Sequence, residues 1–162
     1  MMQQENVQEA AQLYETDTHK YISFTLGRNE FCVDIMTIRE IGGWSEPTPL
    51  PHSPLYVCGV INLRGTVLPI IDFAARIGIS RDENSATPPV TIIMQVDGRL
   101  FGIKVDSVSD ILVLDKAKMQ KVPDSSADET NSFLESIMAM DDRMIRVVNP
   151  ASLFPASSMG TN

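Results

Sequence analysis

The residues best suited to acid–base or nucleophilic chemistry in this sequence are two histidines and the polar side chains near one of them. His19 ends a polar leader, whereas His52 lies in the loop PLPHSPLY beside Ser53. Together with Asp72, these last two could form the serine–histidine–aspartate centre of a hydrolase, in which the histidine takes the hydroxyl proton. Because neighbours in sequence cannot orient one another as a triad requires, a small β-barrel hydrolase using His52 is only a remote alternative.

Other reactive side chains do not form a recognisable site. Asp106, Asp110 and Asp115 alternate with apolar residues, which fits the solvated face of a strand better than a metal site. Cys32 and Cys58 have no CxxC or zinc-like spacing, so we expect reduced thiols packed within strands. No glycine-rich phosphate-binding motif is present. We therefore expect no catalytic residue, no metal and no cofactor.

Composition favours proteins as partners. The chain has 162 residues, is 43% hydrophobic and carries a net charge of -8, which argues against binding to the phosphates of nucleic acid. No stretch approaches the roughly 18 apolar residues of a membrane-spanning helix. The N-terminus lacks the basic start and apolar middle of a signal peptide. We expect a cytoplasmic protein that does not insert into a membrane.

The elements that position these residues come from an internal duplication. Residues 22–41, ISFTLGRNEFCVDIMTIREI, align without a gap with residues 92–111, IIMQVDGRLFGIKVDSVSDI, so that Phe31 meets Phe101. Residues 56–72 align in the same way with residues 133–149. Such agreement predicts two structural repeats, at about residues 20–78 and 90–155, which we call the first and the second repeat.

Each repeat predicts a hairpin, an added strand, a proline-bearing link, a second hairpin and a short helix. Asp72 and Asn149 are suited to N-cap the two helices, and Gly78 to end the first one. About five antiparallel strands per repeat favour an all-β fold in which each repeat curls into a small barrel and the two barrels share a core. Pro69 is then compatible only with an edge or bulged position. Segments 79–89 and 123–131 are predicted loops.

The second hairpin of the first repeat contains the stretch GVINLRGTVLPIIDF, residues 59–73. Its apolar alternation on both sides of Arg64-Gly65 predicts two strands joined by a tight turn. We expect a type II turn in which Gly65 supplies the positive φ and Arg64 projects into solvent. The arginine is then either a solubilising residue or a presented contact.

Several of these segments resemble the coupling proteins of chemotaxis, the CheW family. The resemblance lies in FTLGRNEFCVDI, IREI, GVINLRGTVLPIID, VSDIL and DRMIRVVN, and it extends from about residue 19 to 155. It implies two intertwined five-stranded, SH3-like β-barrels with short helical turns. The flanking segments 1–18 and 156–162 are expected to be flexible tails.

The resemblance also implies a function. CheW-like proteins are non-catalytic adaptors that join the cytoplasmic tips of methyl-accepting chemoreceptors to the histidine kinase CheA, whose regulatory domain has the same fold. Such a protein would be recruited to membrane-attached receptor arrays. The alternative within the family is a CheW-like module of a larger kinase or of a coupling protein fused to a receiver.

Four residues correspond to partner-binding positions of the family. They are Ile38 and Glu40 in TIREI, and Arg64 with Gly65 in NLRG. The position of the Arg64-Gly65 turn is held by Asp141-Asp142 in the second repeat, so matching turns carry opposite charge. We expect each barrel to contact a different neighbour, with the receptor on the first.

Overall fold

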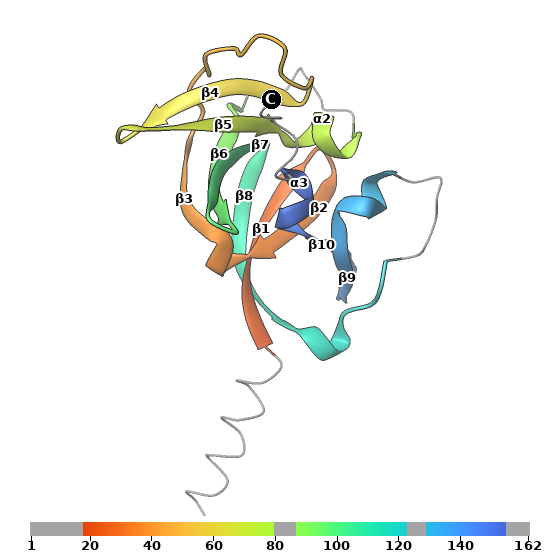
Figure 1. Ribbon diagram of the computed structural model, residues 1–162. Coiled ribbons are helices and arrows are strands. Elements are labelled where there is room, and N and C mark those ends of the chain that lie inside the picture. Colours follow the sequence, from red (N-terminus) through yellow and green to blue (C-terminus); the bar gives the residue numbers. More distant parts are fainter. Residues whose placement is uncertain (1–17, 80–86, 123–128, 155–162) are drawn as a thin grey trace, which may run out of the picture.

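The computed structural model describes residues 18–79, 87–122 and 129–154, which form ten strands and a few short helices (Figure 1). The expected all-β architecture is confirmed, since the strands build two five-stranded sheets. Nearly all of both expected tails, and most of the two expected loops, lie outside the described residues.

The first sheet has the strand order β8-β1-β2-β10-β9, and the second has the order β3-β6-β7-β5-β4. The strands of the first sheet are β1 (Thr18–Leu26), β2 (Asn29–Asp34), β8 (Ser107–Asp115), β9 (Leu134–Met140) and β10 (Arg143–Val148). Those of the second are β3 (Ile38–Gly43), β4 (Val57–Leu63), β5 (Thr66–Asp72), β6 (Val90–Val96) and β7 (Arg99–Val105). The helices are α2 (Phe73–Ile77), α3 (Pro150–Leu153), and the 3-10 turns η1 (Ile35–Thr37), η2 (Lys116–Lys118) and η3 (Glu129–Phe133).

The two repeats exchange strands. Strands β1 to β5 of the first repeat correspond in order to β6 to β10 of the second. Each sheet, however, combines the first two strands of one repeat with the last three strands of the other. The interpretation that each repeat curls into a barrel by itself is therefore wrong, and the intertwined arrangement implied by the family resemblance is confirmed. One pair in each sheet, β2–β10 and β5–β7, is parallel rather than antiparallel.

Apolar side chains of both sheets meet in one central core. Phe73 of α2 packs edge-on against Phe24 and Phe31, with ring centroids 5.2 and 5.1 Å apart. Phe31 and Phe101, which align in the duplication, lie in the equivalent strands β2 and β7 and are both fully buried. Because both repeats supply this core, which buries most of their large apolar side chains, it holds the sheets together.

The short helices begin and end where the sequence predicts. Asp72 accepts a hydrogen bond from the Ala75 amide at 3.3 Å, and Asn149 accepts one from the Ala151 amide at 3.2 Å. Gly78 follows α2 in the left-handed conformation, at φ 83°. These caps turn the chain sharply after β5 and β10, which brings both helices back over the central core.

The outer strands β4 and β9 are each covered by the preceding link. Thr48 exchanges two backbone hydrogen bonds with Val60, of 2.9 and 2.8 Å, and Gln120 does the same with Ile137, at 2.8 and 2.9 Å. Pro69 pairs with β4 but lies before the parallel pairing of β5 with β7, which starts at Ile70. It therefore has a strand on one side only, as its missing N–H requires.

Candidate partner-binding surface

Arg64 and Glu40 form an exposed ion pair. Arg64 lies at the tip of the β4–β5 hairpin, which crosses the top of Figure 1 with its tip at the left. Its two terminal nitrogens lie 2.8 and 3.2 Å from the two carboxylate oxygens of Glu40 on β3. The Arg64 side chain is 77% exposed and that of Glu40 31%. Both charged groups thus remain accessible to a partner.

This ion pair spans the two edges of the second sheet. β3 and β4 stand at opposite ends of its hydrogen-bonded order, yet Glu40 of β3 and Leu63 of β4 line the same groove. The sheet therefore curls until its edges face each other. The same groove is lined by Ile70 and Ile93, whose side chains are almost fully buried, and by Gly42 and Gly43. The groove beside Glu40 is consequently lined mainly by apolar side chains and glycines.

The turn that carries Arg64 differs from our prediction. Arg64 has φ 51° and Gly65 has φ 85°, so both central residues are left-handed, as in a type I′ turn, and the type II prediction is wrong. Type I′ matches the right-handed twist of two-stranded hairpins, which type II does not. The amide of Gly65 donates to the side-chain oxygen of Asn62 at 2.9 Å, which stabilises the turn. The first turn residues of two other hairpins, Asp97 with φ 52° and Asp141 with φ 51°, adopt the same left-handed conformation.

Ile38 lies near Glu40 in sequence but has different contacts. A register shift occurs between Ile38 and Glu40, which pair with the consecutive residues Met94 and Ile93 of β6, so Arg39 is a bulge. Ile38 is half-buried and packs against the central core. The bulge interrupts the two-residue alternation that would otherwise place Ile38 and Glu40 on the same face of β3.

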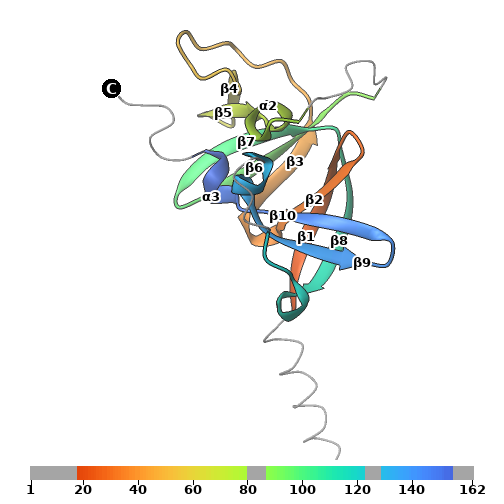
Figure 2. The ribbon, with the colours of Figure 1, turned by 90° about the vertical axis from the view of Figure 1, so that its right-hand side faces the viewer.

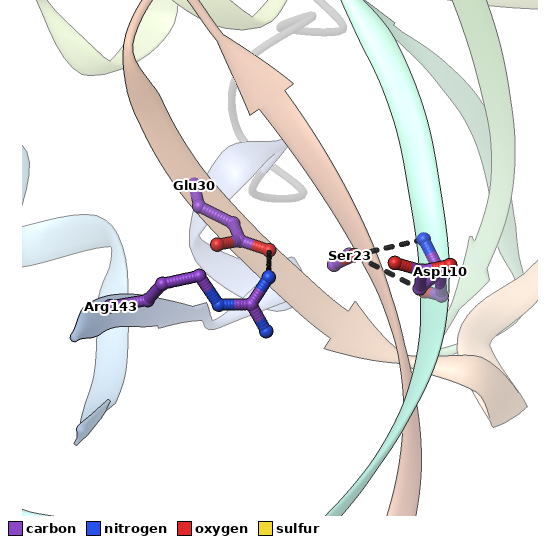
Figure 3. A network of polar contacts seen from close by, with 4 residues as sticks. All are labelled: Ser23, Glu30, Asp110 and Arg143. Atoms are coloured by element: carbon purple, nitrogen blue, oxygen red, sulfur yellow. Dashed lines mark hydrogen bonds and ion pairs between the residues drawn. The ribbon is translucent and has the colours of Figure 1, made fainter. Parts of the chain in front are cut away.

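The equivalent region of the first sheet uses its side chains differently (Figure 3). Asp110, the counterpart of Glu40, is bound through its backbone: its amide donates to the Ser23 hydroxyl at 3.0 Å and its carbonyl accepts from it at 3.2 Å. Arg143, just after the Asp141-Asp142 turn, instead pairs with Glu30 of β2 at 3.5 Å. Figure 2 shows this hairpin, β9 and β10, from the side. The two repeats thus keep one scaffold and present different charges.

Sequence reasoning missed several exposed apolar side chains. Those of Ile111 and Val113 on β8 are 60% and 58% exposed, and that of Met36 in η1 is 85% exposed. In β8 both faces carry apolar residues, since Leu112 and Leu114 are buried, so no contrast in the sequence distinguishes the outer face. Two exposed pairs occupy equivalent positions of the repeats, namely Ile41 with Ile111 and Val67 with Met144.

The residues proposed for hydrolysis have other roles. The Ser53 hydroxyl donates to the Leu50 carbonyl at 3.0 Å, Asp72 caps α2, and His52 lies exposed in a loop. These contacts argue against the hydrolase alternative. Within the described ranges no three His, Cys, Asp or Glu residues are grouped so that they could hold a metal ion. No helix in the same ranges has the length and apolar character needed to cross a membrane.

Both cysteines are free, as we expected. Burial, with smaller contributions from the charges of Glu30 and Glu135, raises the pKa of Cys32 to about 12. Burial also raises the pKa of Cys58, which is only half-buried. Both thiols are therefore neutral near pH 7 and are poor nucleophiles.

These features define a class of protein: an intertwined all-β scaffold that presents charged hairpin tips and apolar strand faces, and that is suited to holding other proteins. Comparison with known proteins supports this class and names the family. Residues 20–158 match the CheW-like domain. The chain is 48% identical over 135 residues to the chemotaxis protein CheW of Rhizobium meliloti (strain 1021), which covers 83% of this chain and 86% of that protein.

Two further relatives agree. A probable chemotaxis protein CheW of Rhizobium etli is 47% identical over 133 residues, covering 82% of this chain and 85% of that protein. The crystal structure of scaffolding protein TtCheW from Thermoanaerobacter tengcongensis has a TM-score of 0.77 and 28% identity, covering 86% of this chain and 90% of that one. The chain therefore belongs to the CheW-like domain family. It is a scaffolding and coupling protein of chemotaxis, and not an enzyme.

Proposed function

We propose that this protein acts in the cytoplasm, where it couples the cytoplasmic tips of methyl-accepting chemoreceptors to the histidine kinase CheA in membrane-attached arrays. The observation that carries this proposal is the match to the CheW-like domain over residues 20–158. The exposed Arg64–Glu40 ion pair supports it, because a charged, accessible hairpin tip offers specificity to a protein partner.

Four residues, from β3 and from the turn between β4 and β5, form what we call the Arg64 surface: Ile38, Glu40, Arg64 and Gly65. We assign receptor binding to this surface. Arg64 and Glu40 supply charge, the half-buried Ile38 supplies apolar contact, and Gly65 permits the turn that presents Arg64. The opposite charge of the Asp141-Asp142 turn favours a different neighbour there, such as the CheW-like regulatory domain of the kinase.

The first test is reconstitution of purified protein with receptor cytoplasmic fragments and CheA, measured by co-sedimentation and kinase activity. Glu40→Arg and Arg64→Glu each place like charges together, whereas the double variant restores an ion pair of reversed orientation. We expect all three variants to fold and to lose coupling, because binding of the partner depends on which position carries the positive charge and which the negative charge. Normal coupling by the double variant would mean that the pair only stabilises the hairpin, and would refute the contact role.

The division of labour between the two hairpins has its own test. Reversal of charge in the double variant Asp141→Lys, Asp142→Lys should weaken assembly with the kinase and leave receptor binding unchanged, because these exposed residues lie on the other hairpin. Separate co-sedimentation with receptor fragments and with CheA measures both. Equal loss of receptor binding from reversals in the two hairpins, with circular dichroism unchanged, would contradict separate neighbours.

A further inference from the structure

Arg76 on α2 contacts two aromatic rings from different repeats. The central carbon of its guanidinium group lies 4.3 Å from the ring centroid of Tyr56 and 4.7 Å from that of Phe133. Both distances are within the range of cation–π attraction, which is stronger where the charge is partly withdrawn from water. Arg76 is half-buried, so this condition is met.

The same guanidinium binds the end of α3. Its Nε donates to the Leu153 carbonyl at 2.8 Å, and a terminal nitrogen donates to the Ser152 carbonyl at 3.1 Å. The last carbonyls of a helix have no partner within the helix, and a forked donor satisfies two of them. A further hydrogen bond is donated by the second repeat to the first. The Thr130 hydroxyl of η3 donates to the carbonyl of Ile77, the last residue of α2, at 2.9 Å.

The duplication shows that this contact cannot be formed twice. Tyr56 and Phe133 occupy equivalent positions, and each carbonyl accepts the equivalent amide hydrogen bond, from Asp72 at 2.7 Å and from Asn149 at 2.9 Å. The equivalent of Arg76 in the second repeat is Leu153, which is fully buried in the central core. One arginine of the first repeat therefore serves both repeats.

We infer that Arg76 is a one-sided lock, which holds η3 and α3 of the second repeat on α2 of the first. α2 follows a strand of the second sheet and α3 follows a strand of the first, so the lock joins the two sheets outside their hydrogen-bonded ladders. Loss of Arg76 loosens η3 and α3 before the strands separate. The burial of Leu153 and the hydrogen bond from Arg99 to the Phe154 carbonyl remain, so α3 opens transiently and does not detach.

Amide hydrogen exchange of the full-length protein, resolved by NMR, tests this inference. In Arg76→Leu we expect exchange at residues 129–133 and 151–154 to rise at least tenfold, with β1, β6 and β7 unchanged. Arg76→Lys should give a smaller rise, because an ammonium group keeps the charge beside the rings but lacks the planar fork. Arg28→Leu, at an exposed arginine of the β1–β2 turn, is the matched control and should behave like the native protein.

Two outcomes would overturn the inference. One is native exchange at residues 129–133 and 151–154 in Arg76→Leu. The other is an equal acceleration in every strand, which would make Arg76 a contributor to global stability only. If Arg76→Leu does not fold, the same comparison is made with Arg76→Lys and with Tyr56→Leu, which removes one of the two rings. A uniform effect or no effect in those variants rejects the lock.

Discussion

At the scale of single residues, Arg64 combines a strained backbone with a weak stabilising contact. Its ion pair with Glu40 is exposed, and such pairs contribute about 0 to 1 kcal/mol because water screens them. A left-handed arginine costs a similar amount. Its charge therefore stabilises the fold little, which is consistent with the contact role we propose.

Arg64→Asn separates folding from binding. Asparagine tolerates the positive φ, which offsets the lost ion pair, so the free energy of unfolding should change by less than about 0.5 kcal/mol. Coupling of receptor to kinase should nevertheless fall. Urea unfolding and the reconstituted kinase assay measure the two effects. A variant that is equally stable and activates the kinase fully would remove Arg64 from the proposed interface.

Cys32 should make the stability depend on alkaline pH. Burial raises its pKa from 9.0 to about 12, so above pH 9 the thiol ionises in the unfolded chain but stays neutral in the native protein. The native state then binds the proton more tightly, and stability falls as pH rises from 9 towards 12, by at most about 1.4 kcal/mol per pH unit from this group.

The measurement is the free energy of unfolding from pH 8 to 11 under reducing conditions. Burial also raises the pKa of Tyr21 to about 12, so the native protein should lose stability through both groups. Cys32→Ala should be less stable at pH 8, because a buried side chain is shortened, but should show a shallower fall. Parallel curves for the two proteins would show that the Cys32 thiol does not titrate differently on unfolding.

At the scale of elements, the link before β4 depends on one glycine. A Cβ atom at Gly59 would lie 2.3 Å from the Thr48 carbonyl oxygen, and Gly59 has φ 148°. That oxygen accepts the amide hydrogen bond of Val60, through which the link covers the outer edge of β4. The absence of a side chain at this position therefore permits the edge to be closed.

Gly59→Ala should destabilise the protein more than Gly65→Ala. Gly65 also has positive φ, but no atom lies within 4 Å of its would-be Cβ, so only backbone strain of about 1 kcal/mol is expected there. At Gly59 strain and a clash with backbone act together, and we expect a loss of more than about 2 kcal/mol. Thermal and urea unfolding of both variants provide the comparison. Equal losses would show that the Thr48 contact relaxes without cost.

At the scale of the whole molecule, strand exchange makes each repeat incomplete. β3 pairs only with β6, and β5 pairs with β7, so three strands of the first repeat require two of the second. The central core likewise draws on both repeats. We therefore expect that the fragments 1–84 and 85–162 do not fold separately and recover both sheets when they are mixed.

Circular dichroism and size-exclusion chromatography of the separate and mixed fragments check this expectation. The mixed sample should regain β structure and elute as a one-to-one complex, because the exchanged strands then find their partners. A cooperative unfolding transition in either fragment alone would show that a single repeat forms a core sufficient for folding.

The sequence by itself determined the local features of this protein. The duplication placed the strands, because residues that alternate between core and solvent repeat at matching positions, and Asp72, Asn149 and Gly78 marked the helix ends through short-range hydrogen bonds and backbone freedom. Residue motifs also indicated the family, whereas the contact residues that they suggest remain a prediction. The strands and the helix caps depend on interactions between near neighbours in the chain.

The tertiary structure alone decided which strands pair and which side chains meet. A strand of the first repeat can pair equally well with its own neighbours or with the equivalent strands of the second, and only the shared central core selects the exchanged arrangement. The turn type at Arg64 follows from hairpin twist, and the bulge at Arg39 from pairing with β6. The meeting of Arg76 with Phe133 and Leu153 has no signal in sequence, because contacts between distant segments arise only when the whole chain has folded.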